Sequence, residues 1–278
     1  MMNRFASCFV LGCVTSTVSA GAACAQNVDF QAFADVLIPD RSVIEVGAGP
    51  KFGPDYLGSN DYNLAFNPEV VVKFRYGQVG DSGVSFDLAP DLDFDIGPFI
   101  RIVGRRTEEQ NEALTGLGDI GRSVELGGFI GVHLDDPGFS ARGRYRADVA
   151  NGHGGSLIDL QATQRLLRRG KFSTAASARI TWVDRDYNST VFGVSEEQSL
   201  ASGQLDIFDP EGGMRDVRLG LSARYNITDN WVINGSASYG RLVQDAADSP
   251  IVDDFGSANQ YRMALTLSRS FRFQLPGQ

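Results

Sequence analysis

The chain has 278 residues, with 25 basic and 34 acidic side chains, and its net charge of −9 argues against nucleic acid as a partner, since no basic stretch could follow a phosphate backbone. Its three cysteines, Cys8, Cys13 and Cys24, all lie in the first 25 residues. Without that segment, 24 basic residues face 34 acidic ones, a net charge of −10, and no thiol remains for disulfides, thiolate metal sites or cysteine nucleophiles. After residue 26, no uncharged apolar run approaches the ~20 residues of a membrane-spanning helix.

Residues 1–25 have the pattern of a secretory signal peptide. Arg4 is their single charge, a long uncharged run follows it, and Ala23-Cys24-Ala25 supplies the small residues that signal peptidase requires. We therefore expect export and cleavage before Gln26. The alternative of a lipid anchor on Cys24 is disfavoured, because Gly21 stands where a lipobox needs a large aliphatic residue.

From residue 43 onward, apolar and polar side chains alternate in segments of about ten residues, the spacing typical of membrane strands. Residues 139–149 show the pattern best: Phe139, Ala141, Gly143, Tyr145, Ala147 and Val149 alternate with Ser140, Arg142, Arg144, Arg146 and Asp148. A strand sends alternate side chains to opposite faces, so one face here meets lipid and the other meets water. Since lipid offers no partner for an open sheet edge, such strands must close into a barrel.

The pattern predicts eleven strands after a short polar lead at residues 26–42. They are expected at 43–52, 66–76, 84–104 as two strands broken at Pro90, 124–134, 139–149, 157–167, 172–183, 217–227, 231–242 and 261–273. From residue 124 the connections alternate short and long, as they do in bacterial barrels with short periplasmic turns. Two periplasmic chain ends need an even strand number, so we expect one more strand hidden between residues 43 and 122, with the stretch Arg105–Gly121 or the N-terminal lead as its favoured place.

These patterns predict an all-β, antiparallel, up-and-down transmembrane barrel of twelve strands, with ten as the alternative. The barrel occupies residues 43–273 as a single domain, and a short tail follows at 274–278. Exported barrels of this kind lie in the outer membrane of Gram-negative cells, in contact with its lipid.

The inward parity of the predicted strands gathers charged side chains. The predicted ladder comprises Asp87, Asp91, Asp93, Asp95, Arg101, Arg142, Arg144 and Arg146. Opposed acidic and basic ladders could focus a field across a narrow pore and select solutes by charge. The alternative is that a small barrel fills its lumen with paired side chains and conducts little.

Two long connections suggest outer loops with a structure of their own. The segment from Asp184 to Arg215 carries aromatic residues and could form either a plug in the lumen or a surface that recognises an external ligand. The connection at 244–260 begins with a plausible turn or helix cap.

No catalytic residue is predicted, and we expect the protein not to be an enzyme. Histidine is the usual general base, and only His133 and His153 are present. Glu125 shares the predicted inward face of His133, but eight residues of extended strand separate them by about 27 Å. Two histidines without thiols give no metal-ligand spacing, so neither metal nor cofactor is expected.

Several short motifs, spread over most of the chain, resemble those of one known family. They include Pro54-x-Tyr56-x-Gly58, Asn151-Gly152-His153-Gly154-Gly155, Tyr187 followed by Thr190-x-Phe192-Gly193, Tyr239-x-Arg241-Leu242, and Asp248-Ser249-Pro250-Ile251. In these residues and their order, the chain resembles the MipA/OmpV family of Gram-negative outer-membrane proteins. One departure is the tail after Phe273, because family members generally end on an aromatic residue of the last strand.

The resemblance implies a scaffold that holds a lytic transglycosylase and a penicillin-binding synthase together at the outer membrane. The periplasmic turns and residues 26–42 would then form the docking surface. Two alternatives stay open: a narrow charge-selective channel, motivated by the luminal charges, and a surface adhesin or receptor, motivated by the long outer loops.

Overall fold

The computed structural model describes residues 42–90 and 92–273. The predicted signal peptide, the lead up to residue 41 and the tail at 274–278 lie outside the described residues. The strands are β1 (Ser42–Pro54), β2 (Tyr62–Phe74), β3 (Gly77–Gly80), β4 (Gly83–Phe86), β5 (Phe94–Val103), β6 (Ser123–Leu134), β7 (Phe139–Asp148), β8 (Ser156–Arg169), β9 (Phe172–Val183), β10 (Gly213–Asn226), β11 (Trp231–Leu242) and β12 (Asn259–Phe273).

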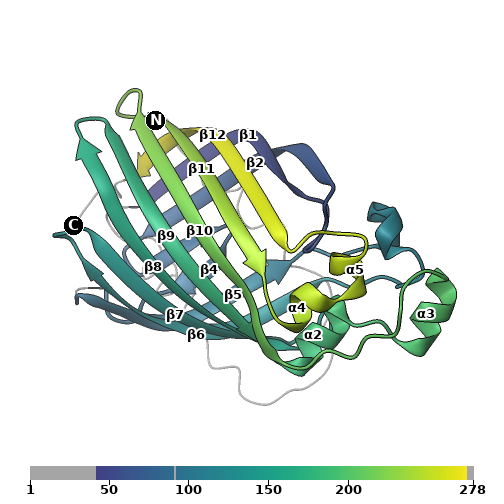
Figure 1. Cartoon of the computed structure of the whole chain (residues 1–278). Coiled ribbons are helices and arrows are strands. Elements are labelled where there is room, and N and C mark those ends of the chain that lie inside the picture. The colour runs from purple at the N-terminus through teal and green to yellow at the C-terminus, as the bar shows by residue number, and fades with distance from the viewer. Residues whose placement is uncertain (1–41, 91, 274–278) are drawn as a thin grey trace, which may run out of the picture. The chain divides into compact units, whose positions relative to one another are not determined.

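The twelve strands form one closed antiparallel barrel in chain order (Figure 1). Each strand pairs with its neighbours in the chain, and β1 closes the barrel against β12, with Val43 opposite Arg272. The predicted fold and the strand number of twelve are therefore confirmed, and the alternative of ten is wrong.

The twelfth strand lies between residues 43 and 122, as predicted, but outside the favoured stretch. It is β3, which forms a tight hairpin with β4, whereas Arg105–Gly121 lies in an outer loop with two short 3₁₀ helices. The sequence Gly77-Gln78-Val79-Gly80 contains one large apolar residue, too few to display alternation. The predicted break at Pro90 is correct, because β4 ends at Phe86 and β5 begins at Phe94.

The two faces of the barrel wall follow the parity of the sequence. On β12, Met263, Leu265 and Leu267 are about half exposed on the outer surface, at 55%, 52% and 46%, whereas Thr266 and Ser268 are buried in the lumen. Apolar side chains therefore face the bilayer, and hydroxyl and charged groups fill the interior.

The two ends of the barrel differ in their connections. One end carries short turns such as Asp135–Gly138, and the other carries long loops with all the described helices (Figure 1). These are η1 (Glu108–Gln110), η2 (Glu112–Leu114), α2 (Arg185–Phe192), α3 (Glu196–Ser202), α4 (Asp245–Asp248) and α5 (Pro250–Asp253). Short turns face the periplasm in bacterial barrels, so the helical end is the outer one. Within the described residues, no helix is long and apolar enough to cross a membrane.

The largest group of buried apolar side chains lies in the outer loops and the adjoining strand ends. We call the loops at residues 55–61, 104–122, 184–212 and 243–258 the outer cap. Leu114, Phe192 and Ile251 in this cap are all 0% exposed and belong to one hydrophobic cluster. The outer end of the barrel thus has a packed core of its own.

Candidate functional site

The outer cap is held together by contacts between loops that are far apart in the sequence. The hydroxyl of Tyr56 donates a hydrogen bond to the carbonyl oxygen of Ile251 at 3.1 Å, and Oγ of Ser249 donates to the carbonyl oxygen of Phe192 at 2.5 Å. Gly58, with φ of +106°, lets the first loop approach Val252, against which a Cβ would stand at 2.6 Å. Three separate connections therefore form one packed lid.

Burial in the cap changes the ionisation of two groups. Burial raises the pKa of the Tyr56 hydroxyl to about 12, although the neighbouring Arg106 charge opposes that shift. Burial lowers the pKa of Arg106 to about 10, which keeps the guanidinium charged at neutral pH. Its Nη1 donates to the carbonyl oxygen of Val191 at 2.7 Å and thereby joins the β5–β6 loop to α2.

The glycine-rich turn between β7 and β8 lies directly beneath α2. A Cβ on Gly155 would stand 2.3 Å from the backbone nitrogen of Tyr187, so only glycine permits this approach. The ring of His153 in the same turn packs edge-on against the Tyr187 ring, with 4.8 Å between centroids. The segment from Asp184 thus begins by packing against this turn at the outer end of the barrel.

A buried ionic cluster lies below this turn, and we call Glu125, His153, Arg146, Asp159 and Thr181 the luminal cluster. Nε2 of His153 lies 3.2 Å from Oε1 of Glu125, and Nε of Arg146 lies 2.9 Å from Oε2 of Glu125 without hydrogen-bond alignment. Arg146 also pairs with Asp159, which accepts a hydrogen bond from the Thr181 hydroxyl at 2.9 Å. All five residues are at most 5% exposed, so Arg146 and the two carboxylates face one another away from bulk water.

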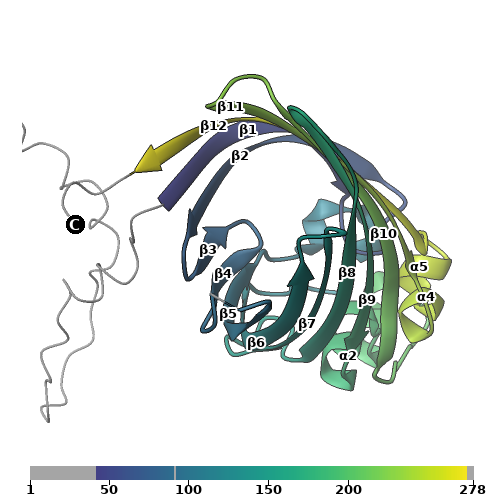
Figure 2. The ribbon, with the colours of Figure 1, turned by 90° about the vertical axis from the view of Figure 1, so that its left-hand side faces the viewer.

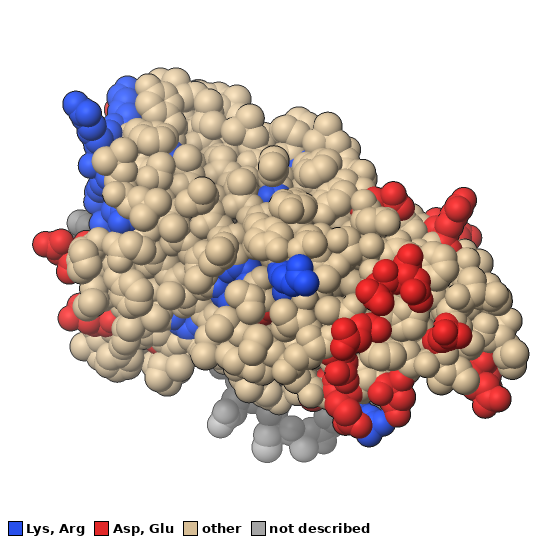
Figure 3. Space-filling model, viewed as in Figure 1, with Lys and Arg blue, Asp and Glu red and all other residues tan. Residues whose placement is uncertain are grey.

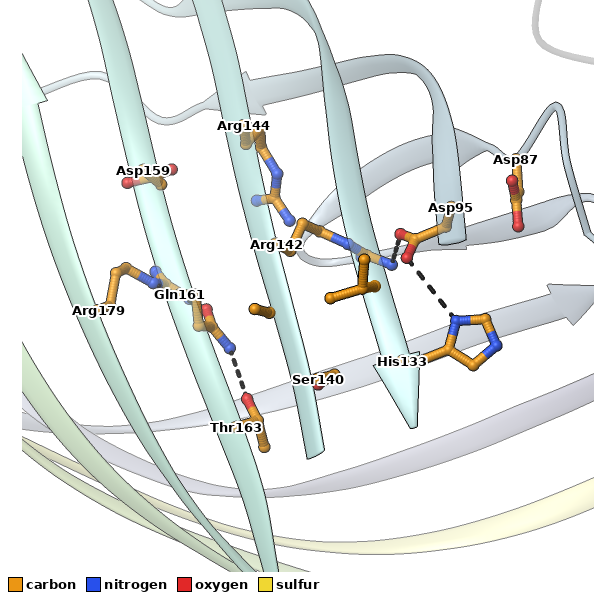
Figure 4. A pocket seen from close by; sticks show the side chains of 12 residues that line it. Asp87, Asp95, His133, Ser140, Arg142, Arg144, Asp159, Gln161, Thr163 and Arg179 are labelled. Carbon is orange, nitrogen blue, oxygen red and sulfur yellow. Dashed lines mark hydrogen bonds and ion pairs between the residues drawn. The ribbon is translucent and has the colours of Figure 1, made fainter. Parts of the chain in front are cut away.

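A second ionic group lies nearer the periplasmic end (Figure 4). Arg142 pairs with Asp95, whose other oxygen lies 4.0 Å from Nδ1 of His133. The Arg142 guanidinium also lies over the Phe129 ring, 4.8 Å from its centroid. Arginine and aspartate from the predicted ladder therefore pair with each other here rather than standing as separate rows.

The remaining ladder residues have different positions. Asp87 lines the same cavity as Asp95, whereas Asp93 is an exposed residue of the periplasmic turn, and Asp91 lies outside the described residues. Arg144 lies over the Phe99 ring at 4.4 Å from its centroid, and Arg101 is the cross-strand neighbour of Glu125. The barrel brings the arginines together with carboxylates that the predicted ladder did not include, Glu125 and Asp159.

Two cavities occupy the lower lumen. The larger, of about 770 Å³, is lined near the periplasmic ends of the strands by residues that include Glu45, Lys73 and Arg224. The smaller, of about 360 Å³, lies around Arg142 and Arg144 and shares His133, Ser140 and Thr163 with the first. Within the described residues, no group of three or more His, Cys, Asp or Glu side chains could hold a metal ion. We call the larger cavity the vestibule, and its lining contains both acidic and basic side chains.

The two ends of the barrel differ in charge. Acidic side chains gather on the outer cap, whereas the periplasmic end carries a group of basic side chains beside a few acidic ones (Figure 3). In the β8–β9 turn, Arg168, Arg169 and Lys171 are exposed, and Nζ of Lys171 donates to the carbonyl oxygen of Ile227 in the next turn at 2.9 Å. We call these three residues the basic rim.

Sequence reasoning placed Glu125 and His153 in separate contexts. Their contact depends on how the β7–β8 turn folds back over β6, and parity alone does not contain that information. A weak signal existed in the inward parity of Glu125 and Asp159, which matched the parity of Arg146 on the neighbouring strand.

Comparison with known proteins agrees with this architecture. Residues 46–271 match the family described as MltA-interacting protein MipA. The chain is 30% identical over 229 residues to outer membrane protein OmpV of Vibrio cholerae serotype O1, covering 70% of this chain and 85% of that protein. It is 28% identical over 132 residues to the MltA-interacting protein of Escherichia coli K12, covering 48% of this chain and 52% of that protein.

Among solved structures, an outer-membrane channel from Pseudomonas putida F1 is similar in fold, with a TM-score of 0.43, 12% identity, and coverage of 84% of this chain and 97% of that one. So distant a likeness carries no functional argument. The family match over most of the barrel, together with relatives that are named as outer-membrane proteins, gives the conclusion: this chain is an outer-membrane β-barrel that belongs to the MltA-interacting protein MipA family.

Proposed function

We propose that the protein anchors peptidoglycan-remodelling enzymes at the periplasmic face of the outer membrane, with a lytic transglycosylase as the first partner and a penicillin-binding synthase as the second. The E. coli relative is named for an interaction with MltA, which supports a partner of the first kind. The observation that carries the proposal is the contrast between an outer end covered by a packed cap and a periplasmic end with an open vestibule and exposed charge.

The outer cap supports an anchor better than a pore. A solute that entered from the periplasm would meet the luminal cluster, whose members are at most 5% exposed, and then the hydrophobic cluster around Phe192. Opening that route would separate buried ion pairs and expose apolar side chains, and each of these costs several kcal/mol.

The basic rim offers a chemically defined docking surface. Arg168 and Arg169 are exposed, and within the described residues no hydrogen bond or ion pair holds their side chains, so their charges remain available to a partner. An acidic face on the partner enzyme would be attracted to this rim, and charge pairs of this kind mainly set orientation and association rate. The predicted lead at residues 26–42 would add a second contact from the same side of the membrane.

The test is co-purification of the transglycosylase with the barrel in lipid nanodiscs. Reversing the rim with Arg168→Glu, Arg169→Glu and Lys171→Glu should weaken binding by roughly tenfold or more at low salt. A matched variant, Glu196→Lys with Glu197→Lys on α3, changes charge at the other end and should leave binding intact. Undiminished binding by the rim variant would overturn the assignment of this surface, and no binding by the wild-type barrel would overturn the anchor itself.

A second candidate is a narrow, charge-selective channel, and the cavity around Arg142, which shares lining residues with the vestibule, favours it. Arg142 is 39% exposed at its side chain and would face a permeating ion. If the barrel conducts, Arg142→Gln should shift its ion selectivity toward cations, because one positive charge leaves the lumen. Unchanged selectivity in a conducting barrel would exclude Arg142 as a filter residue.

A further inference from the structure

The barrel wall is incomplete on one side. β3 and β4 have four residues each, whereas β2 has thirteen (Figure 2). The pairing of β2 with β3 covers only Val72, Lys73 and Phe74, and within the described residues no strand pairs with the rest of β2 on that side. Residues 62–71 therefore form an open edge that extends toward the outer end.

Pro68 lies in the middle of this open edge. The β1–β2 ladder continues without a register shift through the pair Ala48 and Pro68, so the N–H that proline lacks belongs to the side away from β1. The two-residue turn that joins Phe74 to Gly77 agrees, because it directs the peptide groups of even-numbered β2 residues toward β3. Proline at such a position hinders pairing with an added strand, so the sequence favours an edge that stays open.

The opposite side of the gap is open as well. β4 pairs with β5 only at Phe99 and Ile100, although β5 continues to Val103. Gly83, the first residue of β4, has a φ of +113°, and a Cβ on it would stand 2.4 Å from the carbonyl oxygen of Ile100. The β3–β4 hairpin is thus shorter than β2 and β5, the two strands on either side of it, and leaves a gap between them beyond its tip.

The vestibule extends to this hairpin. Its lining includes Glu69 and Val71 on the open strand and the hairpin tip Gly80-Asp81-Ser82. Asp81 pairs with Lys51 on β1 at 2.7 Å, and so the hairpin tip is tied to a strand on the far side of β2. Both side chains are partly exposed, at 34% and 51%, so water weakens this pair and makes it easy to break.

We propose that the gap between β2 and β5 is a lateral portal, latched by Lys51 and Asp81, through which a single-chain amphiphile with a charged head passes between the vestibule and the bilayer. Unpaired backbone groups at membrane depth are tolerated only where they line a water-filled cavity, and the vestibule supplies that water. On the outer surface of the same strand, Leu64 and Phe66 are 72% and 73% exposed and would hold the apolar tail. The charged head would meet Glu69 and Lys73 inside.

The first test measures amide hydrogen exchange of the wild-type barrel in nanodiscs, residue by residue. The even-numbered amides of Leu64, Phe66 and Val70 face the portal and should exchange roughly tenfold or more faster than the odd-numbered amides of Ala65 and Glu69, which face β1. Equal protection of both sets would overturn the portal, because it would mean that another segment or dry lipid covers the edge.

The second test uses two alanines at matched height. Ala65 on β2 and Ala264 on β12 both pair with Lys51, but only Ala65 borders the gap. Each is replaced by cysteine in the thiol-free mature chain and labelled with bimane, and a fatty acid with a mid-chain nitroxide is added as quencher. Quenching should be stronger at Ala65→Cys and should increase further with Asp81→Asn, which releases the latch.

The control for the latch is Asp136→Asn in the β6–β7 turn, which removes the same charge at the periplasmic end rather than at the hairpin tip. Equal quenching at the two alanine positions, or an Asp81→Asn effect that Asp136→Asn reproduces, would overturn the proposal. The portal does not depend on the anchoring function, since neither test involves a partner enzyme.

Discussion

The two ends of this barrel differ in packing and in exposed charge, although the same strands run through both. At the outer end, loops from four parts of the chain bury Phe192, Leu114 and Ile251 completely, and a buried ionic cluster lies below them. At the periplasmic end, short turns leave a charged vestibule of about 770 Å³ and exposed arginines. The difference agrees with the proposed anchor, which would present its recognition chemistry to the periplasm below an outer end covered by the cap.

The most damaging single change to the outer cap should be Phe192→Ala. Its ring is 0% exposed, and truncation of such a side chain costs about 3–5 kcal/mol. The cap should become sensitive to protease while the strands stay folded. Leu200→Ala on α3, where the side chain is 79% exposed, is the matched control and should change cap stability by less than about 0.5 kcal/mol. Equal protease resistance of the wild type and Phe192→Ala would contradict a packed cap.

Glu125→Gln should have the next largest effect, because it leaves Arg146 and His153 without their shared carboxylate. Removing one member of a buried ionic group costs about 3 kcal/mol. We expect a lower temperature for the heat-induced shift in gel migration that reports barrel unfolding. The control is Glu211→Gln, whose carboxylate pairs with Arg185 at 3.2 Å but is 68% exposed. A barrel whose unfolding temperature is unaffected by Glu125→Gln would show that water reaches this cluster.

Gly155→Ala should loosen the contact between the β7–β8 turn and α2. The added Cβ would stand 2.3 Å from the backbone of Tyr187, and overpacking of this kind costs about 2 kcal/mol. Gly121→Ala is the control, since its Cβ would meet only one atom, at 4.0 Å. Hydrogen exchange of the α2 amides measures the effect, and equal rates in the two variants would place α2 away from the turn.

The smallest effect is expected for Tyr56→Phe, which removes one hydrogen bond worth about 1 kcal/mol. It should also change the response to alkali. Because burial raises the pKa of Tyr56 from 10.0 to about 12, the folded cap keeps a proton that the unfolded chain loses, and cap stability falls as pH rises through that interval.

Arg106 contributes to the pH dependence with the opposite sign in both the wild type and Tyr56→Phe, so the difference between the two proteins reports mainly on Tyr56. Protease resistance of the cap is measured at about pH 9, below both pKa values of Tyr56, and near pH 11, between them. Between these two pH values, the resistance should fall more in the wild type than in the variant. Parallel pH profiles would mean that Tyr56 is accessible to water.

Alternation was sufficient to predict the barrel because it is a local property, repeated in each long strand. It failed at β3, where Gly77, Gly80 and a single valine leave nothing to alternate, and where the strand ends within four residues. Short, glycine-rich strands are therefore missed by this kind of prediction. Here the missed strand, β3, belongs to the short hairpin beside the gap in the barrel.

The cap and the luminal cluster could not be predicted in the same way. Tyr56, Phe192 and Ile251 lie in three separate loops, and their contact depends on loop geometry that no periodicity encodes. The arginines of β7 were expected to face inward, but their partners depend on register, which pairs Arg146 with Leu157 and places its side chain beside Asp159. The parity of a residue predicts which face of the barrel wall its side chain lies on, but it does not predict which side chain of the next strand lies beside it.

Single-channel conductance of the refolded barrel in a planar bilayer distinguishes a barrel with a closed outer end from one that is open at both ends. Heat-modifiable migration on a gel first establishes that the barrel is folded. We expect a folded barrel that stays silent, because the luminal cluster and the outer cap block the route. Stepwise, charge-selective openings of the wild-type protein would contradict this expectation and would make the channel the leading function.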